Sequence, residues 1–192
     1  MIRKALSDDA LFCYEMEKAY QPMMAYCPEL KMVIAHEFRD GNISPQVGYA
    51  RMVKRCRETL PEVESWTVRT DSAGYQLEML DQWAADGITF YVTADQFLGM
   101  QNILRSHTEW APYFSNGVKT NQEVAEIAYV PTFSNQEQLE LRRNTFQFIG
   151  VRKPKEGQLE IGADKYIYQV IVTNTRTICA KYFRHTGSVV ER

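Results

Sequence analysis

The sequence lacks the patterns that define several large classes of protein. No apolar run reaches the roughly 18 residues of a transmembrane helix, and the N-terminal stretch MIRKALSDDALF has no apolar core of the kind found in signal peptides. There are no internal repeats and no low-complexity segments. Neither a G-x-x-x-x-G-K-[ST] loop nor a G-x-G-x-x-G motif is present, so nucleotide binding has no support in the sequence.

The few cysteines and histidines do not form a recognisable site. No two cysteines are arranged as C-x-x-C, so neither a zinc site nor a disulfide framework is indicated, and we expect the reduced cysteines of a cytosolic protein. No serine–histidine–acid or cysteine–histidine arrangement stands out. The residues concerned are Cys13, Cys27, Cys56, Cys179, His36, His107 and His185.

Positive and negative charges are nearly balanced, with 22 Lys and Arg, 24 Asp and Glu, and a net charge of −2. This balance is weak evidence against an autonomous DNA-binding domain, which usually has a basic face. Basic residues still gather in three stretches. Each is most often a solvated face, although stretches that converge on one side would contact phosphates. The stretches are Arg51, Lys54, Arg55 and Arg57; Arg142, Arg143, Arg152, Lys153 and Lys155; and Lys181, Arg184 and Arg192.

Strand-like and helix-like segments alternate from residue 30 to residue 95. The first strand is continuously apolar, as in a strand buried on both faces, and Ser44–Pro45 is typical of a helix start. The β-α-β-α-β order predicts an α/β fold in which a mostly parallel sheet has helices on its faces. The predicted strands are 30–38, with a continuously apolar centre at 32–35, then 66–70 and 88–94, and the predicted helices are 45–60 and 75–85.

The chain after residue 95 has a different character. A short helix is predicted at 97–107, and the strand-like segments that follow have no long helix between them. We therefore expect a core over residues 1–95, a β-rich and largely antiparallel insertion over 96–175, and a helical return to the core over 176–192. The strand-like segments are 124–130, 146–151 and 166–173, and an N-terminal hairpin is predicted from 10–14 and 18–24.

Two aspartates directly follow predicted strands. Asp71 comes after the strand at 66–70, and Asp95 comes after the strand at 88–94. Functional residues of open α/β sheets gather at the carboxyl ends of strands, which makes Asp71 a candidate metal ligand. An aspartate ahead of Tyr75 also suits a turn or a helix cap, and position alone favours this structural reading.

Two further sets of residues have both a structural and a functional reading. Ser188 to Glu191 has the S-x-x-E form of a capping box, and the same glutamate could bind a metal from the first turn of a helix. The aromatic residues Trp110, Tyr113 and Phe114 of the predicted insertion could stack on an exposed base. Burial is the expected fate of at least two of them.

Five short motifs stand out along the chain. They are KAYQP at 18–22, EFRDGN at 37–42, VRTDSAGY at 68–75, VTN at 172–174 and GSVVE at 187–191. In this order they resemble the DDE-type transposases of bacterial insertion sequences. EFRDGN, followed by a basic helix, resembles the segment between the first two catalytic aspartates of that family, and VRTDSAGY resembles its second-aspartate motif. GSVVE is a looser match to the approach to its catalytic glutamate.

The resemblance implies an RNase H-like α/β fold, a mixed sheet flanked by helices, with a β-rich insertion before the catalytic glutamate. It makes Asp71 the second and Glu191 the third carboxylate, which bind Mg²⁺ or Mn²⁺ for DNA cleavage and strand transfer. The implied partners are transposon-end and target DNA, with a homodimer in the DNA complex and no membrane, in the nucleoid-associated cytoplasm of a bacterium. The expected DNA-binding residues are Arg69, Arg142, Arg143, Arg152, Lys153, Tyr182 and Arg184.

The sequence departs from the family pattern at both ends. The first aspartate of the family lies upstream of the KAYQP-like region and would fall just before Met1. The tyrosine and arginine that precede the family's glutamate are spaced differently from Tyr182 and Arg184, and only Arg192 follows Glu191. We therefore expect a truncated fragment that is inactive alone. Two alternatives stay open: a remnant that only binds DNA or a partner, and an RNase H-like nuclease that is not involved in transposition.

Overall fold

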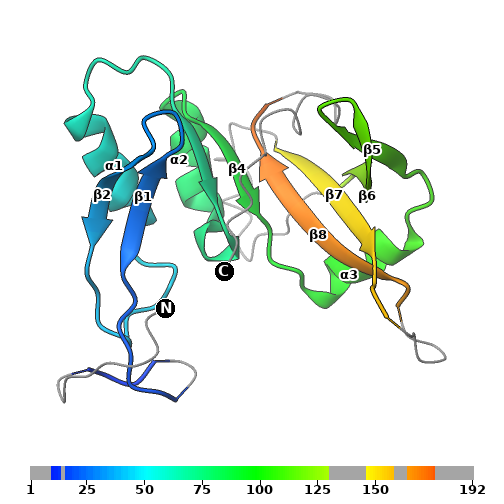
Figure 1. Cartoon of the computed structure of the whole chain (residues 1–192), viewed down its shortest axis with the longest axis horizontal. Helices are drawn as coiled ribbons and strands as arrows, with labels where there is room; N and C mark the ends of the chain where they lie inside the picture. Colours follow the sequence, from blue (N-terminus) through cyan, green and yellow to red (C-terminus); the bar gives the residue numbers. More distant parts are fainter. Residues whose placement is uncertain (1–9, 14–15, 130–145, 158–163, 176–192) are drawn as a thin grey trace, which may run out of the picture. The chain divides into compact units, whose positions relative to one another are not determined.

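The computed structural model describes residues 10–13, 16–129, 146–157 and 164–175. The chain divides into two compact units, Met1–Trp66 and Thr67–Arg192 (Figure 1). This division falls between Trp66 and Thr67, whereas the sequence indicated a boundary at residue 95. None of the helices in the described ranges is both long enough and apolar enough to cross a membrane.

In its described residues, the first unit has a two-stranded hairpin with one helix packed on it. Strand β1 (Met23–Cys27) pairs antiparallel with β2 (Met32–Glu37), and helix α1 (Tyr49–Thr59) packs against the pair. The helix has an apolar face because its apolar side chains recur every three or four residues. Burial raises the pKa of the Cys56 thiol on this face. The buried residues of this core are Met23, Ala35, Met52 and Cys56.

Two predictions for this unit are wrong. Strand β2 was expected in the main sheet, buried on both faces, but it pairs with β1 in a separate two-stranded sheet. Lys31, with φ of 53°, lies in the short turn that joins the two strands, and Met32 and Val33 are exposed. The helix start expected at Ser44–Pro45 is too early. Gly48 has φ of 103°, which a helix does not allow, so α1 begins only after it.

The second unit is built on a six-stranded mixed sheet in the order β3-β4-β8-β7-β6-β5 (Figure 1). Strands β3 and β4 are parallel and are joined through a helix, and the other neighbouring pairs are antiparallel. The expected α/β class, with a mixed sheet flanked by helices, is therefore confirmed. The strands are β3 (Thr67–Thr70), β4 (Thr89–Thr93), β5 (Ala111–Ser115), β6 (Val118–Ile127), β7 (Gln147–Pro154) and β8 (Tyr166–Thr173), and the helices are the 3-10 turn η1 (Ser72–Gly74), α2 (Leu77–Ala85) and α3 (Leu98–Ser106).

The strands expected to form a β-rich insertion continue the same sheet as β3 and β4. Strand β8 lies beside β4, with Tyr91 opposite Thr173. The Asn174 side chain extends this pairing, because its Nδ2 donates to the Ile88 carbonyl at 2.8 Å and the Phe90 N–H donates to its Oδ1 at 3.2 Å. These bonds fasten the end of β8 to a strand far earlier in the chain.

Helices α2 and α3 cover the same face of the six-stranded sheet. Trp83 of α2 contacts Phe90 of β4, with ring centroids 6.4 Å apart. Leu104 of α3 lies over Gly150 of β7, where an added Cβ would be 3.1 Å from the leucine Cδ2. Strand alternation puts Phe90 and Gly150 on one face. The other face has its own apolar cluster of Tyr113, Val124, Ile149, Val151 and Ile171, with Tyr91 packed against it.

Strands β5 and β6 form a tight hairpin that the sequence analysis missed. Its turn consists of Asn116, with φ of 50°, and Gly117, with φ of 80°. Two successive residues with positive φ match the right-handed twist of paired strands, and asparagine followed by glycine adopts this geometry readily. The polar start of β6 hid this hairpin from a search for apolar periodicity.

Candidate functional site

Asp71 lies directly after β3 and caps the short turn η1. Its Oδ1 accepts a hydrogen bond from the Ala73 N–H at 3.2 Å, and its backbone is extended. The residue is exposed to solvent. The capping geometry that position alone favoured is therefore present. An exposed carboxylate at the carboxyl end of a strand can also bind a metal, so the two readings are compatible.

The turn that carries Asp71 depends on the absence of a side chain at Gly74. A Cβ there would lie 2.8 Å from Thr70 Cβ and closer still to Thr70 Oγ1. The Gly74 N–H donates to the Asp71 carbonyl at 3.1 Å, and the Thr70 hydroxyl donates to the same carbonyl at 3.2 Å. The T-D-S-A-G part of the VRTDSAGY motif thus has a packing explanation in which Gly74 lets the chain fold back onto β3.

Asp95 follows β4 and lies at the same end of the sheet as Asp71. Strands β3 and β4 are parallel, and Thr70 is opposite Val92, so the carboxyl ends of both strands lie at the same end of the sheet. Asp95 is exposed, as Asp71 is. Within the residues that the structure describes, no three His, Cys, Asp or Glu side chains are grouped closely enough to hold a metal ion. Predicted catalytic residue Glu191 lies outside those residues, as do Arg142, Arg143, Tyr182 and Arg184.

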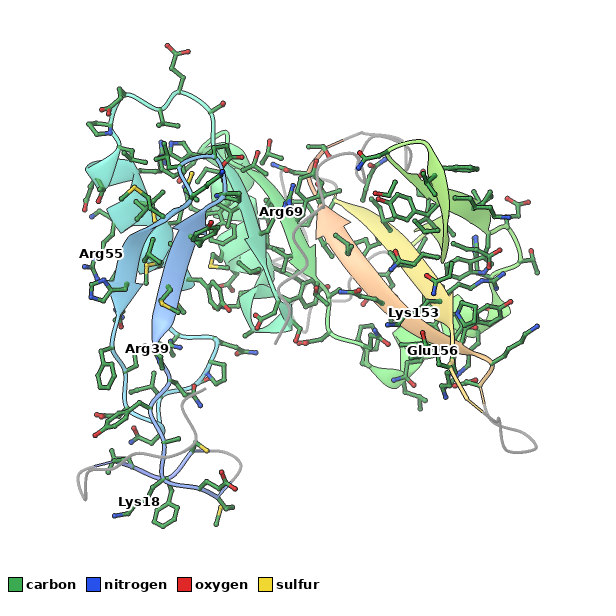
Figure 2. All side chains as sticks on the ribbon, in the orientation of Figure 1. Lys18, Arg39, Arg55, Arg69, Lys153 and Glu156 are labelled. Carbon is green, nitrogen blue, oxygen red and sulfur yellow. The ribbon has the colours of Figure 1, made fainter. Side chains whose placement is uncertain are left out.

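Three of the predicted DNA-binding residues are described, and they differ in their surroundings. Arg69 projects from β3 (Figure 2) and is exposed, with its guanidinium carbon 5.9 Å from the Tyr91 ring centroid. Lys153 on β7 is exposed. Arg152, in contrast, is half-buried, and its Nε donates to Glu123 Oε2 at 2.7 Å.

Arg152 is also held between two aromatic rings. Its guanidinium carbon lies 4.5 Å from the Trp110 ring centroid and 4.3 Å from that of Tyr166. A guanidinium stacks well on such ring faces, and the carboxylate of Glu123 neutralises its charge. The arginine that was expected to contact DNA therefore has an internal structural role.

The Arg152→Gln variant should be less stable by about 1–3 kcal/mol, because it removes the stacked cation and leaves the partly buried Glu123 carboxylate without its ion partner. Urea unfolding followed by tryptophan fluorescence would measure the loss. The neighbouring Lys153→Gln variant removes the same charge from an exposed position and should stay within about 0.5 kcal/mol of the parent. Equal stability of the two variants would contradict a structural role for Arg152.

The three aromatic residues predicted as candidates for base stacking differ in their exposure to solvent. Tyr113 is buried in the apolar cluster of the sheet, and Trp110 is half-buried with its Nε1 donating to the His107 carbonyl at 2.9 Å. Phe114 is 49% exposed. The expectation that at least two would be buried is met fully by one residue and partly by a second.

The KAYQP and EFRDGN motifs lie against each other in the first unit, which the sequence analysis did not foresee. Arg39, which is labelled in Figure 2, is buried. Its Nε donates to the Gln21 carbonyl at 2.9 Å, and another of its guanidinium nitrogens donates to the Val47 carbonyl. The Gln21 N–H in turn donates to the Arg39 carbonyl at 2.9 Å. The Tyr20 and Phe38 rings pack with centroids 4.6 Å apart. These contacts give both motifs a structural role.

Basic residues of α1 are partly paired within the same unit. Arg51 Nε donates to Glu37 Oε2 at 3.1 Å, and this hydrogen bond lowers the pKa of the Glu37 carboxyl. Arg55 donates to the His36 carbonyl at 3.1 Å. This stretch is therefore less available for phosphates than the sequence alone suggested.

No protein-family model and no curated protein matches this sequence. The transposase resemblance therefore stays a prediction.

Proposed function

We propose that this chain is part of a DDE-type transposase with an RNase H-like core, and that Asp71 is one of its metal-binding carboxylates. The observation that carries this proposal is the position of Asp71, exposed at the carboxyl end of β3 beside a parallel neighbour. The surrounding VRTDSAGY motif resembles the second-aspartate motif of that family. Transposon-end and target DNA are the proposed substrates.

The oxygen donors at this end of the sheet suit Mg²⁺ or Mn²⁺. Mg²⁺ is commonly bound by one or two protein carboxylates together with substrate phosphates, so a large cluster of acidic side chains is not required. Asp71 would supply one carboxylate, and the resemblance assigns a second to Glu191. When bound, the ions stabilise the attacking and leaving oxygens of the phosphodiester. The hydrogen bond from Ala73 holds the Asp71 carboxylate in one orientation.

Paramagnetic Mn²⁺ tests this assignment without requiring catalysis. In an NMR titration of the full chain, Mn²⁺ should broaden the amide signals of residues 71–74 first. The Asp71→Asn variant should weaken this effect at least about tenfold, since loss of a direct ligand costs no less than loss of its supporting partners. Mg²⁺ should compete for the same site.

Asp86→Asn provides a matched control, because Asp86 is an exposed aspartate at the end of α2, ahead of β4. This variant should leave the broadening at residues 71–74 unchanged. Broadening that persists in Asp71→Asn, or that centres elsewhere, would overturn the metal-site assignment. DNA binding that survives without Mn²⁺ binding would instead support a module that binds DNA without cleaving it.

A further inference from the structure

Strands β7 and β8 extend beyond the rest of the sheet as a two-stranded arm. The pairing of β6 with β7 begins at Glu123 opposite Arg152, whereas β7 and β8 continue to Pro154 opposite Tyr166. The Lys155 N–H then donates to the Lys165 carbonyl at 3.0 Å. We define the arm as the described residues 153–157 and 164–167. Figure 2 labels Lys153 and Glu156 on it.

The described residues of the arm include three lysines and two acidic residues, and the segment 158–163 that joins its two strands adds one more acidic residue, Glu160. Lys153, Lys155 and Lys165 are all exposed. Of the two acidic residues, Asp164 already accepts Arg105 Nη2 at 2.8 Å, which leaves Glu156 as the exposed carboxylate. An accumulation of lysines on a protruding element attracts a polyanion.

The arm leaves the sheet from the end at which Asp71 lies. Strand β7 has the same direction as β3, because β3 and β4 are parallel and two antiparallel pairings separate β4 from β7. Following the register across the sheet, Asp71 is level with Ile149, and Lys153 lies further out along β7. At usual strand spacings, β7 is about 15 Å to the side of β3, and Lys153 lies about 13 Å further along β7 than the residue level with Asp71. Because neighbouring strands twist relative to each other, this second displacement follows the direction of β7 and not that of β3.

We infer that the β7–β8 arm contacts the phosphate backbone of duplex DNA that lies across the Asp71 end of the sheet, an inference that rests on the proposed function. A duplex segment about 20 Å long is long enough to contact both Asp71 and the arm. It carries on the order of 12 phosphate charges. Single-stranded DNA fits less well at the arm, because it needs open aromatic faces for stacking and the one aromatic residue among the described arm residues, Tyr166, already stacks on Arg152. Lysines are point charges that suit backbone contacts without base recognition.

Fluorescence anisotropy with the full chain tests the arm. A labelled duplex of about 20 base pairs is titrated in EDTA at salt concentrations between about 50 and 200 mM. The triple variant K153Q/K155Q/K165Q should bind at least about tenfold more weakly, and the slope of log K against log salt should fall by about 2–3. The single variant K153Q should show a smaller change of the same sign.

The control K31Q/K54Q/R57Q removes the same charge from exposed positions in the first unit and should change Kd by less than about twofold. Equal weakening in both triple variants, or no duplex binding by the parent chain, would overturn the inference. Binding to phosphatidylserine vesicles that depends on the arm lysines, while duplex binding does not, would also overturn it.

The two proposals fail separately, because DNA binding is measured without divalent ions. If Mn²⁺ binds at Asp71 but the arm variant equals its control, the arm inference alone is wrong. If the arm lysines control duplex affinity but Asp71 binds no Mn²⁺, the metal site is wrong and the arm stands. Circular dichroism melting should confirm that the Lys→Gln variants stay folded.

Discussion

The Gly41→Ala variant should lose the fold of the first unit, because the added Cβ would be 2.7 Å from the Leu11 carbonyl oxygen and closer still to that of Ala19. Both obstacles are backbone atoms, which cannot rotate away as a side-chain end can. Overpacking typically costs about 1–3 kcal/mol, and a cost at the upper end of this range or above it is expected where the obstacles are backbone atoms. An isolated two-stranded hairpin is at best marginally stable, so this unit depends on the packing of its other segments against β1 and β2.

Hydrogen exchange measured residue by residue would localise the effect of Gly41→Ala. Amides of β1, β2 and α1 should lose protection, while those of the six-stranded sheet should keep it. Gly87→Ala serves as the control: Gly87 has φ of 72° and nothing lies near an added Cβ, so only the left-handed conformation is penalised, by about 1–2 kcal/mol. Protection of the hairpin that is unchanged in Gly41→Ala would show that the packing of the two motifs is not essential.

The Gly74→Ala variant should be destabilised by about 2–4 kcal/mol and should also lose Mn²⁺ binding at Asp71. Its Cβ would collide with the Thr70 side chain, and the turn that aims the Asp71 carboxylate would have to open. Chemical denaturation gives the stability loss, and the NMR titration described above gives the metal affinity.

Thr70→Ala combined with Gly74→Ala provides an internal check. Removing the Thr70 hydroxyl and methyl groups eliminates the closest obstacle but leaves its Cβ, so stability should recover in part. The two changes should therefore couple by about 0.5–3 kcal/mol in a double-mutant cycle. Additive losses would mean that Gly74 is needed for a reason other than its contact with Thr70.

Segments with strong apolar periodicity were predictable from the sequence, and strand pairing was not. The expected strand 166–173 coincides with β8, and the helices at 75–85 and 97–107 correspond to α2 and α3. Periodicity describes one segment at a time, so it could not show that β2 pairs with β1 instead of entering the main sheet. Helix α1 begins later than the predicted start at Ser44–Pro45 because Gly48 has a left-handed backbone conformation, which cannot lie inside a helix.

The candidate site was predictable only in part, for a similar reason. Asp71 could be placed because a strand end and a turn are local features. The pairing of Arg152 could not, since Glu123, Trp110 and Tyr166 are all distant in sequence, and only the fold brings them around one guanidinium. The burial of Arg39 was equally hidden, because an arginine next to Asp40-Gly41 reads as an exposed turn.

The two hydrogen bonds between the Asn174 side chain and the backbone of Ile88 and Phe90 have a consequence for biosynthesis. Phe90 leaves the ribosome 84 residues before the asparagine that bonds to it, an interval of about 4–17 s at ordinary translation rates. During that interval the nascent β4 has an unpaired edge, which is a template for wrong associations. The Asn116–Gly117 hairpin needs only neighbouring residues and can form at once. The need for chaperones during translation should therefore be greatest between the synthesis of Phe90 and the synthesis of Asn174.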